Sequence, residues 1–77
     1  MTQTSERIIL YTTPNCSACD QARADLTADG ADFEERSVMA RQEWFDEVLQ
    51  YSISVPVLLR NGKVEVGWKG DLGCPIS

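Results

Sequence analysis

The stretch Asn15-Cys16-Ser17-Ala18-Cys19 decides the fold, because it joins an apolar run to a helical pattern and carries two of the three cysteines. The run before it, residues 8–12, is β-branched and apolar, and its length is typical of a buried strand. Pro14 ends that strand, since proline has no backbone N–H to donate to a sheet. We expect Asn15 to cap the following helix, with Cys16 near its first position.

A thiol at the start of a helix is chemically activated. Unpaired backbone N–H groups and the positive end of the helix dipole favour the thiolate over the thiol. A second thiol one turn away can close a disulfide, so the spacing predicts a reversible redox switch. In this interpretation Cys16 attacks a substrate disulfide and Cys19 resolves the intermediate. Asp20 opposes the activation, because its negative charge disfavours a nearby thiolate.

The rest of the chain alternates between strand-like and helix-like patterns. We expect a helix over residues 16–29, a strand over 33–38, an amphipathic helix over 41–51 and a strand over 55–59. Asn61-Gly62 is a strong hairpin signal and predicts a return strand over 63–67. Residues 68–77 look irregular. The order β-α-β-α-β-β predicts an α/β domain whose four-stranded mixed sheet holds a parallel pair and an antiparallel hairpin.

Bulk properties narrow the class of protein. The chain has 77 residues, of which 43% are hydrophobic and 25% charged, as in one folded domain over residues 1–77. Its net charge of -5 argues against nucleic acid and membrane as partners. The apolar run at residues 8–10 is too short for a signal peptide or a membrane span. We therefore expect a cytoplasmic protein, where a Cys-x-x-Cys pair is more often redox-active or metal-binding than structural.

From residue 8 to 72 the chain resembles the glutaredoxin-like branch of the thioredoxin superfamily. The motifs that carry this resemblance are Leu10-Tyr11-Thr12 leading into Cys16-Ser17-Ala18-Cys19, Asp29-Gly30-Ala31-Asp32-Phe33-Glu34-Glu35, Ser54-Val55-Pro56-Val57 and Gly67-Trp68-Lys69-Gly70-Asp71-Leu72. The resemblance implies a thioredoxin-like fold in which Pro56 is cis and packs against the dithiol. It also implies that the Val55 backbone binds a peptide or glutathione as one more strand.

Resemblance also assigns the loop that follows the last predicted strand. Gly67 and Asp71 match a loop that holds glutathione in glutaredoxins. Trp68-Lys69-Gly70 is similar to the Trp-x-Gly of NrdH-redoxins, which donate electrons to ribonucleotide reductase and take them from thioredoxin reductase. Thr13 stands where both groups usually carry a lysine. The implied substrate-binding residues are Thr13, Val55, Pro56, Gly67, Trp68 and Asp71. No bound cofactor is implied, and the electron donor would be glutathione or a thioredoxin-reductase-type partner.

The family's C-terminal helix has no counterpart in this sequence up to Ser77. In the family that helix covers part of the sheet face shared with the first helix. The resemblance therefore predicts apolar surface on that face, which is exposed, covered by residues 68–77, or buried in a homodimer.

Three functions remain open for the thiols. The favoured one is a small thiol–disulfide oxidoreductase that reduces protein disulfides or glutathione mixed disulfides. The second is a metal- or cluster-binding module using Cys16, Cys19 and Cys74, although the chain has no histidine and no second cysteine pair. The third is a non-catalytic interaction domain. Cys74 itself either packs as a small residue or acts as a third thiol.

Several side chains have simpler expected roles. Trp44 and Phe45 lie on the apolar stripe of the second helix and are expected in the core. Trp68 either caps the sheet or forms a docking platform beside the site. Glu34 and Glu35 are expected on a solvated face.

Overall fold

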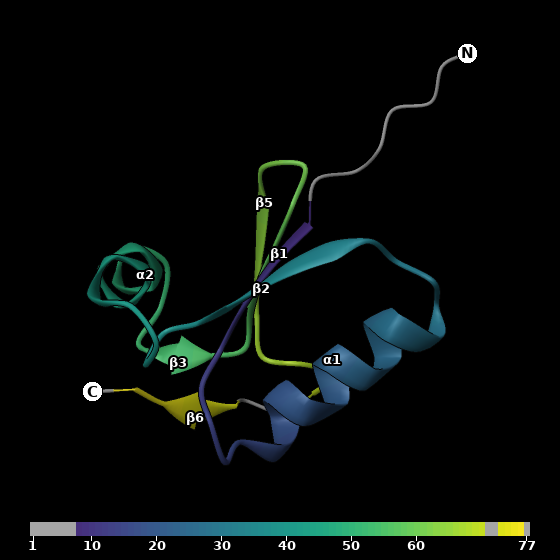
Figure 1. Ribbon diagram of the computed structural model, residues 1–77, viewed down its shortest axis with the longest axis horizontal. Coiled ribbons are helices and arrows are strands. Elements are labelled where there is room, and N and C mark those ends of the chain that lie inside the picture. The colour runs from purple at the N-terminus through teal and green to yellow at the C-terminus, as the bar shows by residue number, and fades with distance from the viewer. Residues whose placement is uncertain (1–7, 71–72, 77) are drawn as a thin grey trace.

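The structure is a computed structural model, and it describes residues 8–70 and 73–76. In chain order its elements are β1 (Ile8–Thr12), α1 (Ser17–Ala28), β2 (Phe33–Ser37), α2 (Gln42–Leu49), β3 (Ser54–Val55), β4 (Val57–Arg60), β5 (Lys63–Val66) and β6 (Cys74–Pro75). One sheet has the order β2-β1-β4-β5, with β1 parallel to β2 and antiparallel to β4 (Figure 1). The predicted α/β order and the four-stranded mixed sheet are confirmed.

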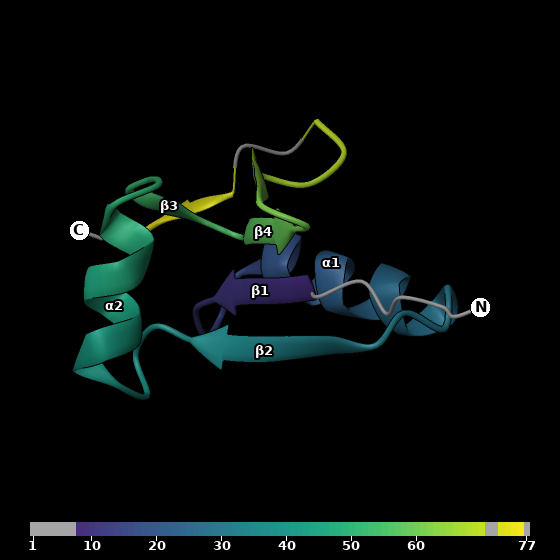
Figure 2. The same ribbon diagram turned by 90° about the horizontal axis from the view of Figure 1, so that it is seen from above.

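Strand β1 forms the centre of the molecule because its two faces pack against different partners. Successive side chains of a strand point to opposite faces. Leu10, which is fully buried, joins Leu58 of β4 and Leu26 of α1 in one apolar cluster. Tyr11 and Val57 belong to a second cluster. Burial of each such leucine contributes about 1.5–3 kcal/mol relative to exposure. Figure 2 shows α1 along one side of the sheet and α2 across one end of the strands.

An ion pair fixes α1 to β2. Arg23 donates two hydrogen bonds to the carboxylate of Glu35, at 2.7 and 2.6 Å, and the Thr12 hydroxyl donates a third at 2.9 Å. Arg23, and to a smaller extent Thr12, hold the pKa of Glu35 below its ordinary value although partial burial opposes them. The expectation that Glu35 lies on a solvated face is therefore wrong, because the carboxylate joins two elements.

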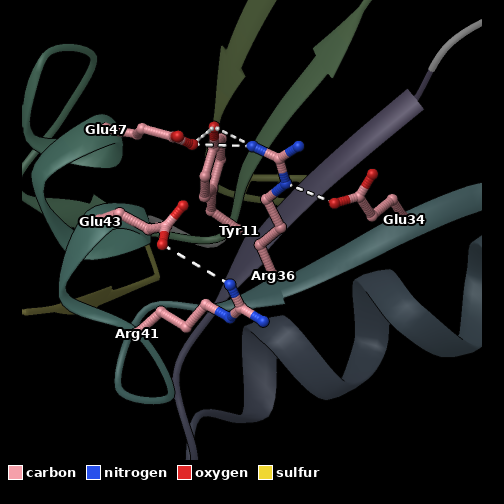
Figure 3. Close-up of polar contacts among 6 residues, drawn as sticks. All are labelled: Tyr11, Glu34, Arg36, Arg41, Glu43 and Glu47. Atoms are coloured by element: carbon pink, nitrogen blue, oxygen red, sulfur yellow. Dashed lines mark hydrogen bonds and ion pairs between the residues drawn. The ribbon is translucent and has the colours of Figure 1, made fainter.

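A second polar cluster fixes α2 to the sheet (Figure 3). The Tyr11 hydroxyl donates to Glu47 of α2 at 2.8 Å, and Arg36 donates to the same carboxylate oxygen at 2.7 Å. The Arg36 guanidinium also lies 5.9 Å from the ring centres of both Tyr11 and Trp44. Arg36 therefore bridges β2, β1 and α2.

The core position of the α2 aromatic residues differs from expectation. Trp44 and Phe45 are only half-buried, and the fully buried residue of α2 is Val48. Phe45 packs at the margin of a core cluster, whereas Trp44 lies beneath the guanidinium of Arg41 at 5.0 Å. Because α2 stands across the strand ends, its apolar stripe covers less of the sheet than the amphipathic pattern suggested.

Three local features differ from the predicted elements. Cys16, not Asn15, is the N-cap of α1, and Asn15 has a left-handed φ of 62° that turns the chain into the helix. The strand predicted over 55–59 is divided at Pro56 into β3 and β4. Within residues 68–77, which were expected to be irregular, Cys74 and Pro75 form β6 and pair with β3 (Figure 1).

A partly exposed apolar surface lies on the sheet face that points away from α1. Ile9, Leu59 and Val64 are cross-strand neighbours on the face that points away from α1. Together with Tyr51, Asn61 and Gly62 they line a depression of about 270 Å³. On the α1 face, Trp68 packs against the cluster that contains Leu26. Of the alternatives left open for the α1 face, cover by residues 68–77 is thus seen at Trp68.

Within residues 8–70 and 73–76, neither helix combines the length and the apolar character needed to cross a membrane.

The pKa of the Tyr11 hydroxyl should report on the polar cluster that fixes α2 to the sheet. Burial, and then the hydrogen bond to Glu47, raise the pKa of Tyr11 from 10.0 to about 12. The folded state therefore keeps this proton when the unfolded chain loses it. Its contribution to stability is present below pH 10.0 and is lost as the pH rises through about 12.

We expect the Tyr11→Phe variant to lose the tyrosinate transition near pH 12 in an ultraviolet absorbance titration. The Tyr51→Phe variant is the matched control and should keep that transition. A transition near pH 12 that persists in Tyr11→Phe would contradict the assignment.

Candidate active site

Cys16 lies at the junction between the central strand and the first helix. As the N-cap of α1 it has extended dihedral angles, φ -120° and ψ 114°, and its carbonyl accepts the Asp20 N–H at 3.0 Å. The Cys16 side chain makes no capping hydrogen bond at this helix end. The Cys16 sulfur is therefore placed at the positive end of the helix, as the sequence predicted within one residue. Both Cys16 and Cys19 are 0% exposed.

A cis peptide bond faces Cys16. The Val55-Pro56 bond is cis, as the family resemblance implied. The Cys16 sulfur lies 4.0 Å from the carbonyl oxygen of Val55. On the other side, the buried Gly67 donates its N–H to the Pro56 carbonyl at 2.8 Å. Three predicted site residues, Val55, Pro56 and Gly67, are thus brought together near Cys16.

The third cysteine completes this arrangement. Cys74 forms a disulfide with Cys16, and their Cα atoms lie 6.1 Å apart. Strand β6 pairs antiparallel with β3, so that Cys74 stands opposite Val55. The pairing continues one residue further, where Ile76 donates its N–H to the Ile53 carbonyl at 2.9 Å. Packing and a third thiol were the two roles left open for Cys74. Its bond to Cys16 is compatible with the second of them.

This disulfide also links distant parts of the sequence. Cys16 and Cys74 are 58 residues apart, and a link that closes so long a loop restricts the unfolded chain. In the chain-entropy model the effect is about 4 kcal/mol for a loop of this length. The disulfide that joins the start of α1 to β6 therefore contributes a large share of the free energy of unfolding. For a small domain this free energy is commonly about 5–15 kcal/mol.

Cys19 is the free cysteine of this structure, and it is buried. Burial raises the pKa of the Cys19 thiol above its ordinary value, although a backbone hydrogen bond from Thr13 and the charge of Arg23 act in the opposite direction. The thiol is therefore mostly protonated near neutral pH. Thr13 acts here through its backbone, and the contact is with Cys19.

Trp68 and Lys69 both contact α1 through Asp25. The indole N–H of Trp68 donates to Asp25 of α1 at 2.7 Å, and Lys69 pairs with the same carboxylate oxygen at 3.1 Å. These two contacts, Trp68 first, keep the pKa of Asp25 below its ordinary value. Of the two expected roles for Trp68, packing on α1 and the sheet is the one seen. The predicted site residue Asp71 lies outside the described residues.

The part of the chain that the structure describes contains no group of three or more Cys, His, Asp or Glu side chains arranged to hold a metal ion. Cys16 and Cys74, two of the three thiols proposed for a metal or cluster site, are joined to each other.

A cysteine at a helix N-terminus, beside a cis-proline on a sheet of this order, defines a thioredoxin-like protein of the thiol–disulfide oxidoreductase kind. The family model described as Glutaredoxin matches residues 8–65. The chain therefore belongs to the glutaredoxin family.

Two other proteins are similar to this chain in sequence or in structure. The "Gene 56 protein" of Mycobacterium phage L5 is 37% identical over 67 residues, which cover 83% of this chain and 65% of the phage protein. The chain thus spans less than two thirds of that relative. The crystal structure of a mutant of the thioredoxin-like protein BC3987 superposes with a TM-score of 0.77 at 25% identity, covering 80% of this chain and 82% of the other.

Sequence reasoning left the role of Cys74 open between packing and a third thiol, and it missed the strand that carries this cysteine. A signal was present in the sequence. Cys74 follows the loop expected near the dithiol, and the apolar residue Ile76 stands two positions after it. That spacing is compatible with a strand whose alternate residues turn inward. With Pro75 between them and so few residues, the pattern is too short to separate from a loop.

Thiol counting should test the arrangement directly. In the chain with the Cys16–Cys74 disulfide, we expect iodoacetamide to leave Cys19 almost unlabelled near neutral pH, because this thiol is buried and its pKa is raised. Unfolding the same oxidised chain should expose one thiol, and reduction with unfolding should expose all three cysteines. Rapid labelling of Cys19 in the folded oxidised chain, mapped by mass spectrometry, would contradict the structure.

Proposed function

We propose that the chain reduces disulfides of proteins, or mixed disulfides of glutathione, by thiol–disulfide exchange that begins at Cys16. The observation that carries this proposal is the sulfur–sulfur bond of Cys16 itself, formed at the N-cap of α1 and next to the cis-Pro56 bond. A position that holds one disulfide partner in place is suited to hold another. The glutaredoxin family supports thiol oxidoreductase activity in general.

Cys16 is the best candidate for the nucleophile, and Cys19 lies behind it. The Cys16 sulfur is near the Val55 carbonyl, at the edge where a substrate strand would pair. Free N–H groups of the first turn of α1 would stabilise its thiolate. Cys19 is one turn further along the helix and fully buried, so an external disulfide would meet Cys16 first.

For the electron donor, we favour a thioredoxin-reductase-type dithiol over glutathione. Glutathione carries two carboxylates, which need cations or free N–H groups to bind them. Lys69 is engaged by Asp25 at 3.1 Å, and Arg23 is engaged by both Glu35 and Asp20. Thr13 replaces the lysine that the family usually carries before the first cysteine. Binding by a protein donor depends less on these single charges.

Replacing the nucleophile tests the function. We expect Cys16→Ser to lose disulfide reduction down to the uncatalysed rate, measured with insulin and with bis(2-hydroxyethyl) disulfide, because a serine hydroxyl does not exchange with disulfides. The matched variant Cys19→Ser has the same change of atom one turn away, and it should still form a mixed disulfide at Cys16. Full activity of Cys16→Ser would contradict the proposal.

The donor is tested by coupling the wild-type chain to NADPH through two reducing systems. We expect faster NADPH oxidation with thioredoxin reductase than with glutathione and glutathione reductase at equal concentrations of the chain. A faster glutathione-coupled rate would contradict the choice of donor while leaving the role of Cys16 intact.

A further inference from the structure

We propose that Cys74 is the resolving cysteine of this chain, and that segment 73–76 closes over the substrate edge of β3 when it acts. This inference rests on the proposed function, since it concerns the fate of the intermediate formed at Cys16. It transfers to Cys74 the role that the Cys-x-x-Cys spacing suggested for Cys19.

Segment 73–76 lies on the edge of β3 that a substrate strand would use. Strand β3 has only two residues, and β6 pairs with it so that Cys74 faces Val55 and Pro75 faces Ser54. A bound peptide would add to this edge through the same backbone groups. The segment and a substrate strand therefore exclude each other, and the chain's own residues occupy the site that would otherwise bind substrate.

The segment also fits this edge closely on both sides of Cys74. After the cysteine, Ile76 is 8% exposed and belongs to the core cluster that contains Cys16, Cys19 and Val55. Before the cysteine, Gly73 has a φ of +86°, and a Cβ at this position would collide with the Val55 carbonyl and meet Pro56. An apolar anchor and a tight backbone approach thus hold Cys74 in register with Cys16.

Access to the sulfur atoms supports the same assignment. With the segment in place Cys16 is 0% exposed, so an external disulfide reaches it only when segment 73–76 has moved away. Cys19 is 0% exposed as well, and its raised pKa leaves little thiolate to attack with. Cys74 is only half-buried, and it approaches Cys16 from the side on which substrate would lie.

The reaction balances without a further reagent. The Cys16 thiolate attacks one sulfur of a substrate disulfide, forms a mixed disulfide and releases the first substrate thiolate. The Cys74 thiolate then attacks the Cys16 sulfur, forms the Cys16–Cys74 bond and releases the second substrate thiolate. Each released thiolate takes a proton from water. One substrate disulfide is reduced to two thiols, while two cysteine thiols are oxidised to one disulfide.

A single-turnover experiment separates the two candidate resolving thiols. The fully reduced chain is mixed with bis(2-hydroxyethyl) disulfide, quenched with acid and alkylating agent, and analysed by mass for the hydroxyethyl adduct. Cleavage after Arg7, Arg23 and Lys69 leaves Cys16 and Cys19 in one peptide and Cys74 in another. A Cys16–Cys74 bond is therefore seen as two linked peptides, and a Cys16–Cys19 bond as one.

We expect Cys19→Ser to lose the adduct at close to the wild-type rate and to give the two linked peptides. The matched variant Cys74→Ser should lose the adduct at least about tenfold more slowly, because a protonated buried thiol is a poor nucleophile. Wild-type loss of the adduct in Cys74→Ser, with persistence of the adduct in Cys19→Ser, would overturn the inference. Failure of all three proteins to react at Cys16 would instead overturn the proposed function.

A pair of glycine variants tests the fit of the segment while keeping every cysteine. Gly73→Ala and Gly70→Ala place the same strained residue at similar positive φ values, +86° and +88°, but only at Gly73 does the new Cβ meet Val55. We expect Gly73→Ala to form the linked peptides about tenfold or more slowly than Gly70→Ala, since the segment no longer seats. Equal rates for the two variants would overturn the proposed closure of segment 73–76.

Discussion

The edge formed by Val55 and the cis-Pro56 bond is the constraint on which the rest of the site depends. It receives Cys16 from the N-cap of α1 and the Gly67 N–H from the loop after β5. It also receives Cys74 from β6. Four segments of the chain therefore meet at two residues, Val55 and Pro56. Because β3 is so short, loss of its register would displace all of them.

In our proposal, access to the Cys16 sulfur controls the chemistry of this site more than local charge does. The cysteine expected to be nucleophilic is fully buried, and two cations of this region are engaged by carboxylates: Arg23 by Glu35 and Lys69 by Asp25. A thiolate at Cys16 would depend on the helix end for its stabilisation. Movement of segment 73–76 would then decide when Cys16 can react. In this account the disulfide form is a closed state and the reduced form an open one.

Local patterns in the sequence predicted most of the fold. Residues 8–12 predicted β1 and the hairpin signal Asn61-Gly62 predicted the pair β4 and β5, while Pro14 and Asn15 placed the start of α1 within one residue. These features are local, so that a few neighbouring residues decide them. The alternation of helices and strands then limited the topology to very few arrangements.

The features that sequence could not supply depend on contacts between distant residues. The pairing of β6 with β3 involves only two residues on each side, too few for a periodic signal. The solvated role expected for Glu35 was overturned by Arg23, and the expected core position of Trp44 by the angle of α2 across the strand ends. In each case a tertiary partner, and not the residue type, decided the outcome.

Hydrogen exchange at the Ile76 amide tests the central claim most directly, because this N–H reports whether segment 73–76 is seated on the edge. In the oxidised chain, where Ile76 donates to Ile53, we predict slow exchange in an NMR experiment. Reduction with a dithiol should raise its rate at least about tenfold, since the short pairing loses its covalent support. The Gly67 amide, which donates to Pro56, should stay protected in both states. Equal exchange of Ile76 before and after reduction would contradict the account.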